Sequence, residues 1–162
     1  MIAARPKRVL CIAGGGGHVE ELYGCLDAFD GHEVRLAHYD WSTLRDFRHR
    51  NLTRCYGIFL GGHEGMRLLI GTILTTFQWL WILLTFRPHV LFSTGAELAI
   101  IPFWLGRILL RSRCIFLETA ARKERPSGTA PFVYPVCETF LVQSEALLKH
   151  LGPKARYAGR LM

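Results

Sequence analysis

Several patterns that identify common protein classes are missing from this sequence. The four glycines at 14–17 are not followed by Lys-Ser or Lys-Thr, which excludes a P-loop. The seven histidines show no metal-ligand spacing and the five cysteines include no C-x-x-C pair, so no metal site is expected. We expect the cysteines to be buried thiols in a reducing cytosol. No long apolar stretch with a small-residue cleavage site precedes the glycines, so we expect no signal peptide.

Acidic residues are fewer than basic ones, and the excess of positive charge points to an anionic partner. There are 13 Asp and Glu against 20 Lys and Arg, a net charge of +7, which suits nucleic acid, a lipid surface or phosphorylated substrates. The basic residues cluster at 45–54, 107–113 and 122–125, each beside a strongly apolar stretch. This arrangement favours a membrane surface. Neither a basic helix nor a polar sheet with exposed aromatics is evident, so no nucleic-acid partner is expected.

Internal repeats and low-complexity tracts are absent too, and residues 1–162 fit one domain. Short β-rich runs alternate with helical patterns, which predicts a Rossmann-like α/β fold with a parallel sheet. Nearly continuous apolar runs such as RVLCIA and RCIFLE indicate strands covered by helices on both faces. The predicted strands are 7–13, 33–39, 54–60, 89–94, 113–118, 139–143 and 155–158, and the predicted helices are 17–29, 64–86, 96–110 and 144–150.

The predicted helix at 64–86 contains no charged residue from 68 to 86. Its length is close to the roughly 20 residues that span a bilayer, but a span would separate strands that one parallel sheet needs on the same side. We therefore expect a helix lying in the membrane interface, with Gly71, Thr75, Gln78 and Thr85 facing the protein. The residues expected to contact lipid are Phe77, Trp79, Trp81 and Leu84. A crossover helix buried in the protein is the alternative.

The stretch CIAGGGGHVEEL places the glycines where the first strand is predicted to enter a helix, a turn that suits an anion. The dinucleotide fingerprint requires a third glycine where Val19 stands, and Asp40, after the second strand, gives weak support for a nicotinamide site. His18 lies at the predicted start of the helix, where a neutral imidazole can accept a proton from a substrate hydroxyl. The alternative for His18 is a helix cap, and a cap is what we expect of Glu21.

Several short motifs follow one another along the chain, from the Gly-Gly-His turn to the C-terminal Tyr-x-Gly-Arg-Leu. Their residues are Gly16, Gly17, His18, Glu21, Gly95, Pro102, Glu118, Arg122, Ser127, Thr129, Tyr134, Pro135, Phe140, Val142, Gln143, Tyr157, Gly159, Arg160 and Leu161. In these motifs, over nearly its whole length, the chain resembles the Alg-fourteen family and the PssD-type bacterial subunits, which are membrane-associated subunits of split glycosyltransferases. Two departures, Ala130 in place of a frequent glycine and an apolar helix in mid-chain rather than at the N-terminus, favour a bacterial polysaccharide enzyme.

The resemblance implies a glycosyltransferase of the GT-B fold divided over two chains, of which this one is the acceptor-side lobe. A separate subunit is expected to bind the nucleotide of the donor. The expected reaction is inverting transfer from a UDP-sugar to a sugar on a polyprenyl-diphosphate acceptor, in polysaccharide or lipid-linked oligosaccharide synthesis. Because no Asp-x-Asp occurs, we expect no metal and no cofactor. The protein is expected to lie on the cytoplasmic face of the inner or plasma membrane, as a peripheral or monotopic protein.

His18 and Glu118, each at the carboxyl end of a predicted strand, are the candidate catalytic residues. Glu118 has four possible roles: the base itself, a residue that orients His18, a group that binds acceptor hydroxyls, or an ion-pair partner of Arg122. With Lys123 and Arg125, Arg122 forms a basic loop suited to the acceptor diphosphate. The residues expected to bind the acceptor are Gly15, Gly16, Gly17, Gly95, Thr119, Arg122, Ser127 and Thr129.

Two other functions remain open from the sequence. One is a non-catalytic membrane recruiter that brings a complete enzyme to its lipid substrate. The other is a nucleotide-binding oxidoreductase. His63 and Glu64, in a second Gly-Gly-His combination before the apolar helix, are expected to form a turn and a helix cap rather than to contact the acceptor.

Overall fold

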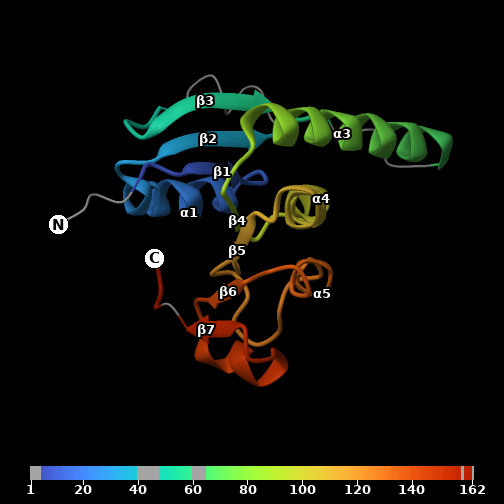
Figure 1. Cartoon of the computed structure of the whole chain (residues 1–162). Helices are drawn as coiled ribbons and strands as arrows, with labels where there is room; N and C mark the ends of the chain where they lie inside the picture. Colours follow the sequence, from blue (N-terminus) through green and yellow to red (C-terminus); the bar gives the residue numbers. More distant parts are fainter. Residues whose placement is uncertain (1–4, 40–47, 60–64, 158, 162) are drawn as a thin grey trace.

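The computed structural model describes residues 5–39, 48–59, 65–157 and 159–161. Strands and helices alternate along the chain, as the sequence predicted (Figure 1). The strands are β1 (Arg8–Ile12), β2 (Glu33–His38), β3 (Leu52–Gly57), β4 (Val90–Thr94), β5 (Arg113–Leu117), β6 (Thr139–Val142) and β7 (Ala155–Tyr157). The α-helices are α1 (Gly17–Cys25), α3 (Gly65–Phe86), α4 (Ile100–Leu110) and α5 (Ala130–Val133), and the 3-10 helices are Leu26–Phe29, Glu97–Ala99 and Glu145–His150.

The strands form one parallel sheet in the order β3-β2-β1-β4-β5-β6-β7. The sheet separates two hydrophobic clusters, because side chains along a strand alternate between its faces. Val9 and Cys11 of β1 pack with α1, whereas Leu10 and Ile12 pack with α3 and α4. Figure 1 shows α1 on one face and α3, α4 and α5 on the other. The Rossmann-like parallel sheet with helices on both faces is therefore confirmed.

Helix α3 connects β3 to β4; its C-terminal half contributes Trp79, Ile82, Leu83 and Phe86 to the core, whereas its N-terminal half is mostly exposed and extends beyond the ends of the strands (Figure 1). On the protein side, Thr75 donates a hydrogen bond to the carbonyl of Phe59, and Gln78 donates one to the carbonyl of Gly57. Thr85 differs from the prediction: it is exposed, and its hydroxyl donates to the carbonyl of Trp81 in its own helix. The helix is long and apolar enough to cross a membrane, and a third of its Leu69–Phe86 window is buried. It is therefore neither wholly buried nor wholly exposed.

One of the four residues predicted to contact lipid is in the core. Trp79 is 1% exposed and belongs to the cluster between the sheet and α3, so its indole cannot reach lipid in this structure. The hydrophobicity of the segment is nearly uniform, and the sequence therefore did not distinguish Trp79 from Trp81, two positions further along the helix. Phe77, Trp81 and Leu84 are 66%, 54% and 52% exposed, in the positions expected of them.

The exposed apolar side of α3 continues onto α4, which packs against it. The indole N–H of Trp104 in α4 donates a hydrogen bond to the carbonyl of Phe132 in α5, which links the two helices. We call the whole area the apolar surface; its residues are Met66, Leu69, Ile70, Ile73, Leu74, Phe77, Trp81, Leu84, Trp104, Ile108, Leu109 and Phe132. The sequence indicated the α3 part and missed the contribution of α4 and α5. Exposed apolar side chains gathered on neighbouring helices typically mark a site of contact with a protein or a membrane.

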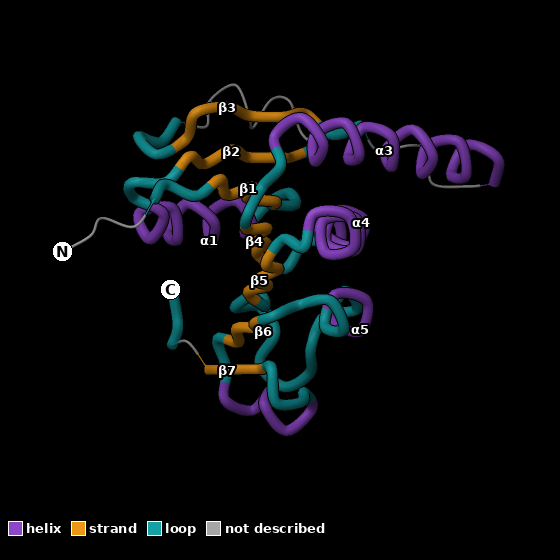
Figure 2. The backbone as a smooth tube through the Cα atoms, viewed as in Figure 1, coloured by secondary structure: helices purple, strands orange, loops and turns teal. Residues whose placement is uncertain are grey.

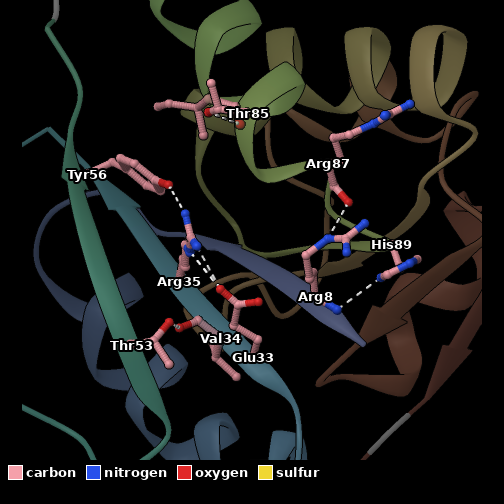
Figure 3. Close-up of polar contacts among 10 residues, drawn as sticks. Arg8, Glu33, Val34, Arg35, Thr53, Tyr56, Thr85, Arg87 and His89 are labelled. Atoms are coloured by element: carbon pink, nitrogen blue, oxygen red, sulfur yellow. Dashed lines mark hydrogen bonds and ion pairs between the residues drawn. The ribbon is translucent and has the colours of Figure 1, made fainter. Parts of the chain in front are cut away.

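A network of polar contacts connects side chains of β2 and β3 near the end of α3 (Figure 3). The Arg35 guanidinium donates to the hydroxyl of Tyr56 at 2.6 Å, pairs with Glu33 at 2.7 Å and lies 4.1 Å from the ring centroid of Phe86. These hydrogen bonds raise the pKa of Arg35 although burial opposes them. The network fixes the last turn of α3 against the edge of the sheet.

Candidate active site

A pocket of about 370 Å³ lies where β1, β4 and β5 end, at the carboxyl edge of the sheet. Ligands of open parallel sheets bind at this edge. Six of its ten lining residues were predicted from the sequence as site residues: His18, Gly95, Thr119, Arg122, Ser127 and Thr129. The other four are Glu97, Ile100, Gly128 and Phe132. We call this the carboxyl-edge pocket.

His18 occupies the first turn of α1. The glycines before it have no side chains, so the backbone of this turn is open to the space beside the imidazole. Gly16 precedes the helix with φ 65°, a left-handed conformation that suits glycine. The cap position therefore belongs to Gly16, and neither His18 nor Glu21 forms a side-chain cap. The His18 carbonyl accepts a hydrogen bond from the Thr94 hydroxyl at 2.7 Å, which ties the start of α1 to the end of β4.

The His18 imidazole packs directly against Gly95, the residue that follows β4. Gly95 has φ 75°, and a Cβ built there would lie 2.8 Å from His18 Cε1 and 2.9 Å from His18 Nδ1. Glycine is therefore required both by the backbone and by the ring. Nδ1 is buried, and among the described residues it has no hydrogen-bond partner. Nε2 is thus the ring nitrogen left for a ligand in the pocket.

Glu118 lies beneath the carboxyl-edge pocket rather than in its lining. The side chain is fully buried, and its Oε2 accepts hydrogen bonds from the backbone N–H and the hydroxyl of Ser127, both at 2.9 Å. Oε1 accepts from the backbone N–H of Thr119 at 3.1 Å. Of the roles considered for Glu118, this arrangement matches none. The carboxylate instead holds together the two ends of the loop from Thr119 to Ser127, drawn in teal between β5 and α5 in Figure 2.

Glu21 was expected to be a helix cap, and this prediction was wrong. The side chain is 3% exposed, and its Oε1 accepts hydrogen bonds from the Thr119 hydroxyl at 2.9 Å and the Ala120 N–H at 2.7 Å. Oε2 is buried and has no partner in the described part of the chain. Glu21 therefore connects α1 to the loop after β5. The spacing of His18 and Glu21 by three residues, which puts both on one side of a helix, was the available signal.

Several predicted residues lie outside the pocket lining. The backbone N–H of Gly15 donates to the hydroxyl of Tyr39, and the lining residues do not include Gly15, Gly16 or Gly17. Within the basic loop only Arg122 lines this pocket, because Arg125 lines a neighbouring hollow and Lys123 is exposed. Asp40, His63 and Glu64 lie outside the described residues.

Comparison with known proteins decides the family. The family model described as "Oligosaccharide biosynthesis protein Alg14 like" matches residues 62–161, more than half of the chain. The chain belongs to the Alg14-like family. It is also 25% identical over 186 residues to the UDP-N-acetylglucosamine transferase subunit ALG14 of Saccharomyces cerevisiae (strain ATCC 204508 / S288c), an alignment that covers 98% of this chain and 78% of the yeast protein.

Solved structures show the same fold in larger proteins. MurG of Acinetobacter baumannii superposes with a TM-score of 0.73 at 17% identity, covering 93% of this chain and 45% of MurG. The UDP-GlcNAc 2-epimerase of Neisseria meningitidis bound to UDP-GlcNAc gives a TM-score of 0.63 at 12% identity, covering 94% of this chain and 46% of the epimerase. The chain therefore spans just under half the length of these proteins. At such low identity the likeness shows the fold alone.

The Alg14-like motif residues near the C-terminus support the loop around Glu118. The Gln143 side chain donates to the Glu118 carbonyl at 3.1 Å and accepts from the Leu161 N–H at 3.0 Å. Ser144 donates to the carbonyl of Lys123 at 2.7 Å. Conformation in this region thus depends on segments far apart in sequence, which a motif in a single sequence does not reveal.

All five cysteines are free thiols. Cys11, Cys114 and Cys137 are buried, as predicted, whereas Cys25 and Cys55 are half-buried. Desolvation, and to a smaller extent the charge of Glu21, raises the pKa of Cys25 to about 11. Within the described residues, no group of three or more His, Cys, Asp or Glu side chains is arranged to hold a metal ion.

Proposed function

We propose that this Alg14-like chain is the acceptor-binding, membrane-associated subunit of a two-chain glycosyltransferase. The donor is a UDP-sugar, the acceptor a polyprenyl-diphosphate-linked sugar, and the product a polysaccharide or lipid-linked oligosaccharide. The observation that carries the proposal is the carboxyl-edge pocket, whose lining includes His18, Arg122 and Phe132 of the apolar surface. One pocket thus combines an imidazole that can accept a proton, a guanidinium that can bind a phosphate and a phenyl ring at the edge of the apolar surface.

In the proposed reaction, His18 Nε2 takes the proton from an acceptor hydroxyl while that oxygen attacks the anomeric carbon of the donor sugar. The bond from this carbon to the UDP oxygen breaks, UDP leaves with the electron pair, and the anomeric configuration inverts. General-base catalysis of this kind contributes about 10²- to 10⁴-fold in rate. No metal or cofactor is required by these steps.

The remaining pocket residues position the acceptor. Arg122 provides a guanidinium that can pair bidentately with phosphate oxygens. Thr119, Ser127 and Thr129 place hydroxyl groups around the sugar, although two of these hydroxyls are already engaged by Glu21 and Glu118. We therefore assign Glu21 and Glu118 as positioning residues that shape the lining without touching the acceptor.

A second subunit is expected because the chain aligns over 98% of its length with a protein named as a subunit of UDP-N-acetylglucosamine transferase. The donor nucleotide would then bind mainly to the partner. The cytoplasmic face of the membrane is the proposed location, since free thiols fit a reducing compartment.

The test is a transfer assay on the complex, obtained by co-purification with the partner from membranes. UDP release is measured with a polyprenyl-diphosphate acceptor and with a short-chain, water-soluble analogue. We expect His18→Ala to reduce kcat by about 10²- to 10⁴-fold with both acceptors. The control is His32→Ala. It removes a half-buried imidazole that directly precedes β2, at the edge of the sheet opposite the carboxyl-edge pocket.

Two outcomes would contradict the proposal. Near wild-type turnover in His18→Ala would remove this residue from the chemistry. Full activity of the partner alone towards the water-soluble analogue would show that this chain only recruits a complete enzyme to the membrane.

A further inference from the structure

A second pocket, of about 530 Å³, lies at the amino edge of the sheet, opposite the carboxyl-edge pocket. Among the described residues, no carboxylate lines it and five cationic side chains do: Lys7, Arg8, Arg87, Arg111 and Arg113. Like charges around one hollow repel each other and disfavour the folded state unless an anion offsets them. We call this the amino-edge pocket.

Its cations are mostly free to bind a ligand. Arg113 pairs with Glu138 at 2.6 Å, and Arg8 donates from Nε to the carbonyl of Arg87 at 2.9 Å (Figure 3). In the part of the chain that the structure describes, the side chains of Lys7, Arg87 and Arg111 make no hydrogen bond or ion pair. The carbonyls of Arg87 and Pro88 are already bonded, by Arg8 and by the Ser112 hydroxyl, so they do not offset this charge.

The local potential is positive enough to affect a neighbouring histidine. His89 accepts a hydrogen bond at Nδ1 from the backbone N–H of Arg8 at 3.0 Å. Desolvation, followed by the charges of Arg8 and Lys7, lowers the pKa of His89. The pocket thus favours neutral or negative groups over additional positive charge.

The backbone gives an independent indication. Arg87 directly follows α3 with φ 50° and Arg111 directly follows α4 with φ 55°, and they are the two non-glycine residues with positive φ in the described chain. Glycine or asparagine usually fills this left-handed position after a helix. The helix dipole favours a cation near a helix C-terminus, but a cation elsewhere in the last turn would have the same benefit without a positive φ. Two arginines in disfavoured conformations, directed to one hollow, indicate a role beyond folding.

The surroundings indicate which anion binds. Leu109 lines the amino-edge pocket and is also part of the apolar surface, so the cations adjoin the area proposed to lie in lipid. Basic side chains at the border of an apolar helix face are placed at the level of lipid headgroups. We propose that the amino-edge pocket binds the phosphate of an anionic phospholipid headgroup and so fixes the orientation of the protein on the membrane. This inference rests on the membrane association proposed above.

The test compares binding to vesicles of phosphatidylcholine alone and vesicles that also contain phosphatidylglycerol. The variant Arg87→Gly/Arg111→Gly removes two cations and places glycine where φ is positive, so it is expected to fold at least as well as the wild type. We expect it to lose about 25-fold in partition onto the anionic vesicles, about fivefold per charge, and to bind neutral vesicles unchanged. The matched control, Lys149→Ser/Arg156→Ser, removes two exposed charges at the far end of the sheet and is expected to lose much less.

Each outcome separates this inference from the proposed function. Wild-type protein that binds no vesicles would contradict the proposed membrane association, whereas equal binding to both kinds of vesicle would overturn the headgroup site alone. Equal losses of binding in the two double variants would show that only the net charge of the protein matters, and would also overturn the headgroup site.

Two further results would assign the pocket differently. If inorganic phosphate displaces the protein from anionic vesicles more than chloride of equal ionic strength does, the pocket binds a soluble anion instead. Loss of transfer to the water-soluble acceptor in Arg87→Gly/Arg111→Gly would place the pocket in the catalytic machinery and overturn the assignment.

Discussion

The replacement Gly95→Ala tests the geometry on which the proposed chemistry depends. The new Cβ would lie 2.8 Å from His18 Cε1 and 3.1 Å from Thr119 Cβ. To restore an ordinary carbon–carbon contact of about 3.5 Å, the imidazole has to move by about 0.7 Å. Because a misplacement of about 1 Å in a catalytic group can cost about 10²-fold, we expect kcat to fall by about 10- to 100-fold.

The same replacement strains the backbone, and this cost has to be separated from the movement of His18. Alanine at φ 75° costs about 1–3 kcal/mol. Gly31→Ala is the matched control, because Gly31 also has φ 75° but nothing lies within 4 Å of the position of its Cβ. Both variants should lose about 2–4 °C in Tm per kcal/mol, by differential scanning fluorimetry, and only Gly95→Ala should lose turnover. Equal turnover in the two variants would contradict the proposed role of the His18 imidazole as the base.

Three further predictions concern buried and exposed groups. Glu118→Gln places an amide NH2 against either the Ser127 donors or the Thr119 N–H, so we expect a loss of about 1–3 kcal/mol in the free energy of unfolding, measured in urea. Cys11 should resist iodoacetamide at pH 8 in native protein, and Cys25 should react slowly because its raised pKa, about 11, leaves little thiolate; mass spectrometry measures both. Trp81→Ala should weaken vesicle binding with little change in stability, whereas Trp79→Ala should cost about 3–5 kcal/mol of folding free energy.

Different results would contradict each of these. Glu118→Gln that is inactive yet as stable as the wild type would indicate that Glu118 touches the acceptor. Rapid alkylation of Cys11 before unfolding would contradict its burial between the sheet and α1. Stability losses of the same size in the two tryptophan variants would contradict the orientation of α3.

Patterns local in the sequence predicted the fold well. Apolar strands such as 113–118 and the turn at Gly16 depend on neighbouring residues, and the structure has β5 and the start of α1 within a few residues of the predicted bounds. Among the described residues, the α-helix that the sequence did not predict is α5, which has only four residues, too few to show helical periodicity. Thr129 and Ser127 were predicted from motif resemblance, and both line the carboxyl-edge pocket.

The sequence did not reveal which side chains near the site are enclosed by protein. Glu21 and Glu118 could each have faced the acceptor, but both accept hydrogen bonds from the loop after β5, and this depends on how that loop packs against α1. Trp79 and Trp81 are likewise equal in composition, and the rotation of α3 about its axis buries one of them. The amino-edge pocket was invisible as well, because Lys7, Arg87 and Arg111 come together only through the order of strands in the sheet.

Phe132 belongs both to the lining of the carboxyl-edge pocket and to the apolar surface. Under the proposed function, an acceptor held in the membrane by a prenyl chain would therefore enter the pocket without leaving the bilayer. Its search for the enzyme is then diffusion in two dimensions. The rate of such a reaction follows the number of acceptor molecules per unit of membrane area rather than their concentration in the bulk solution.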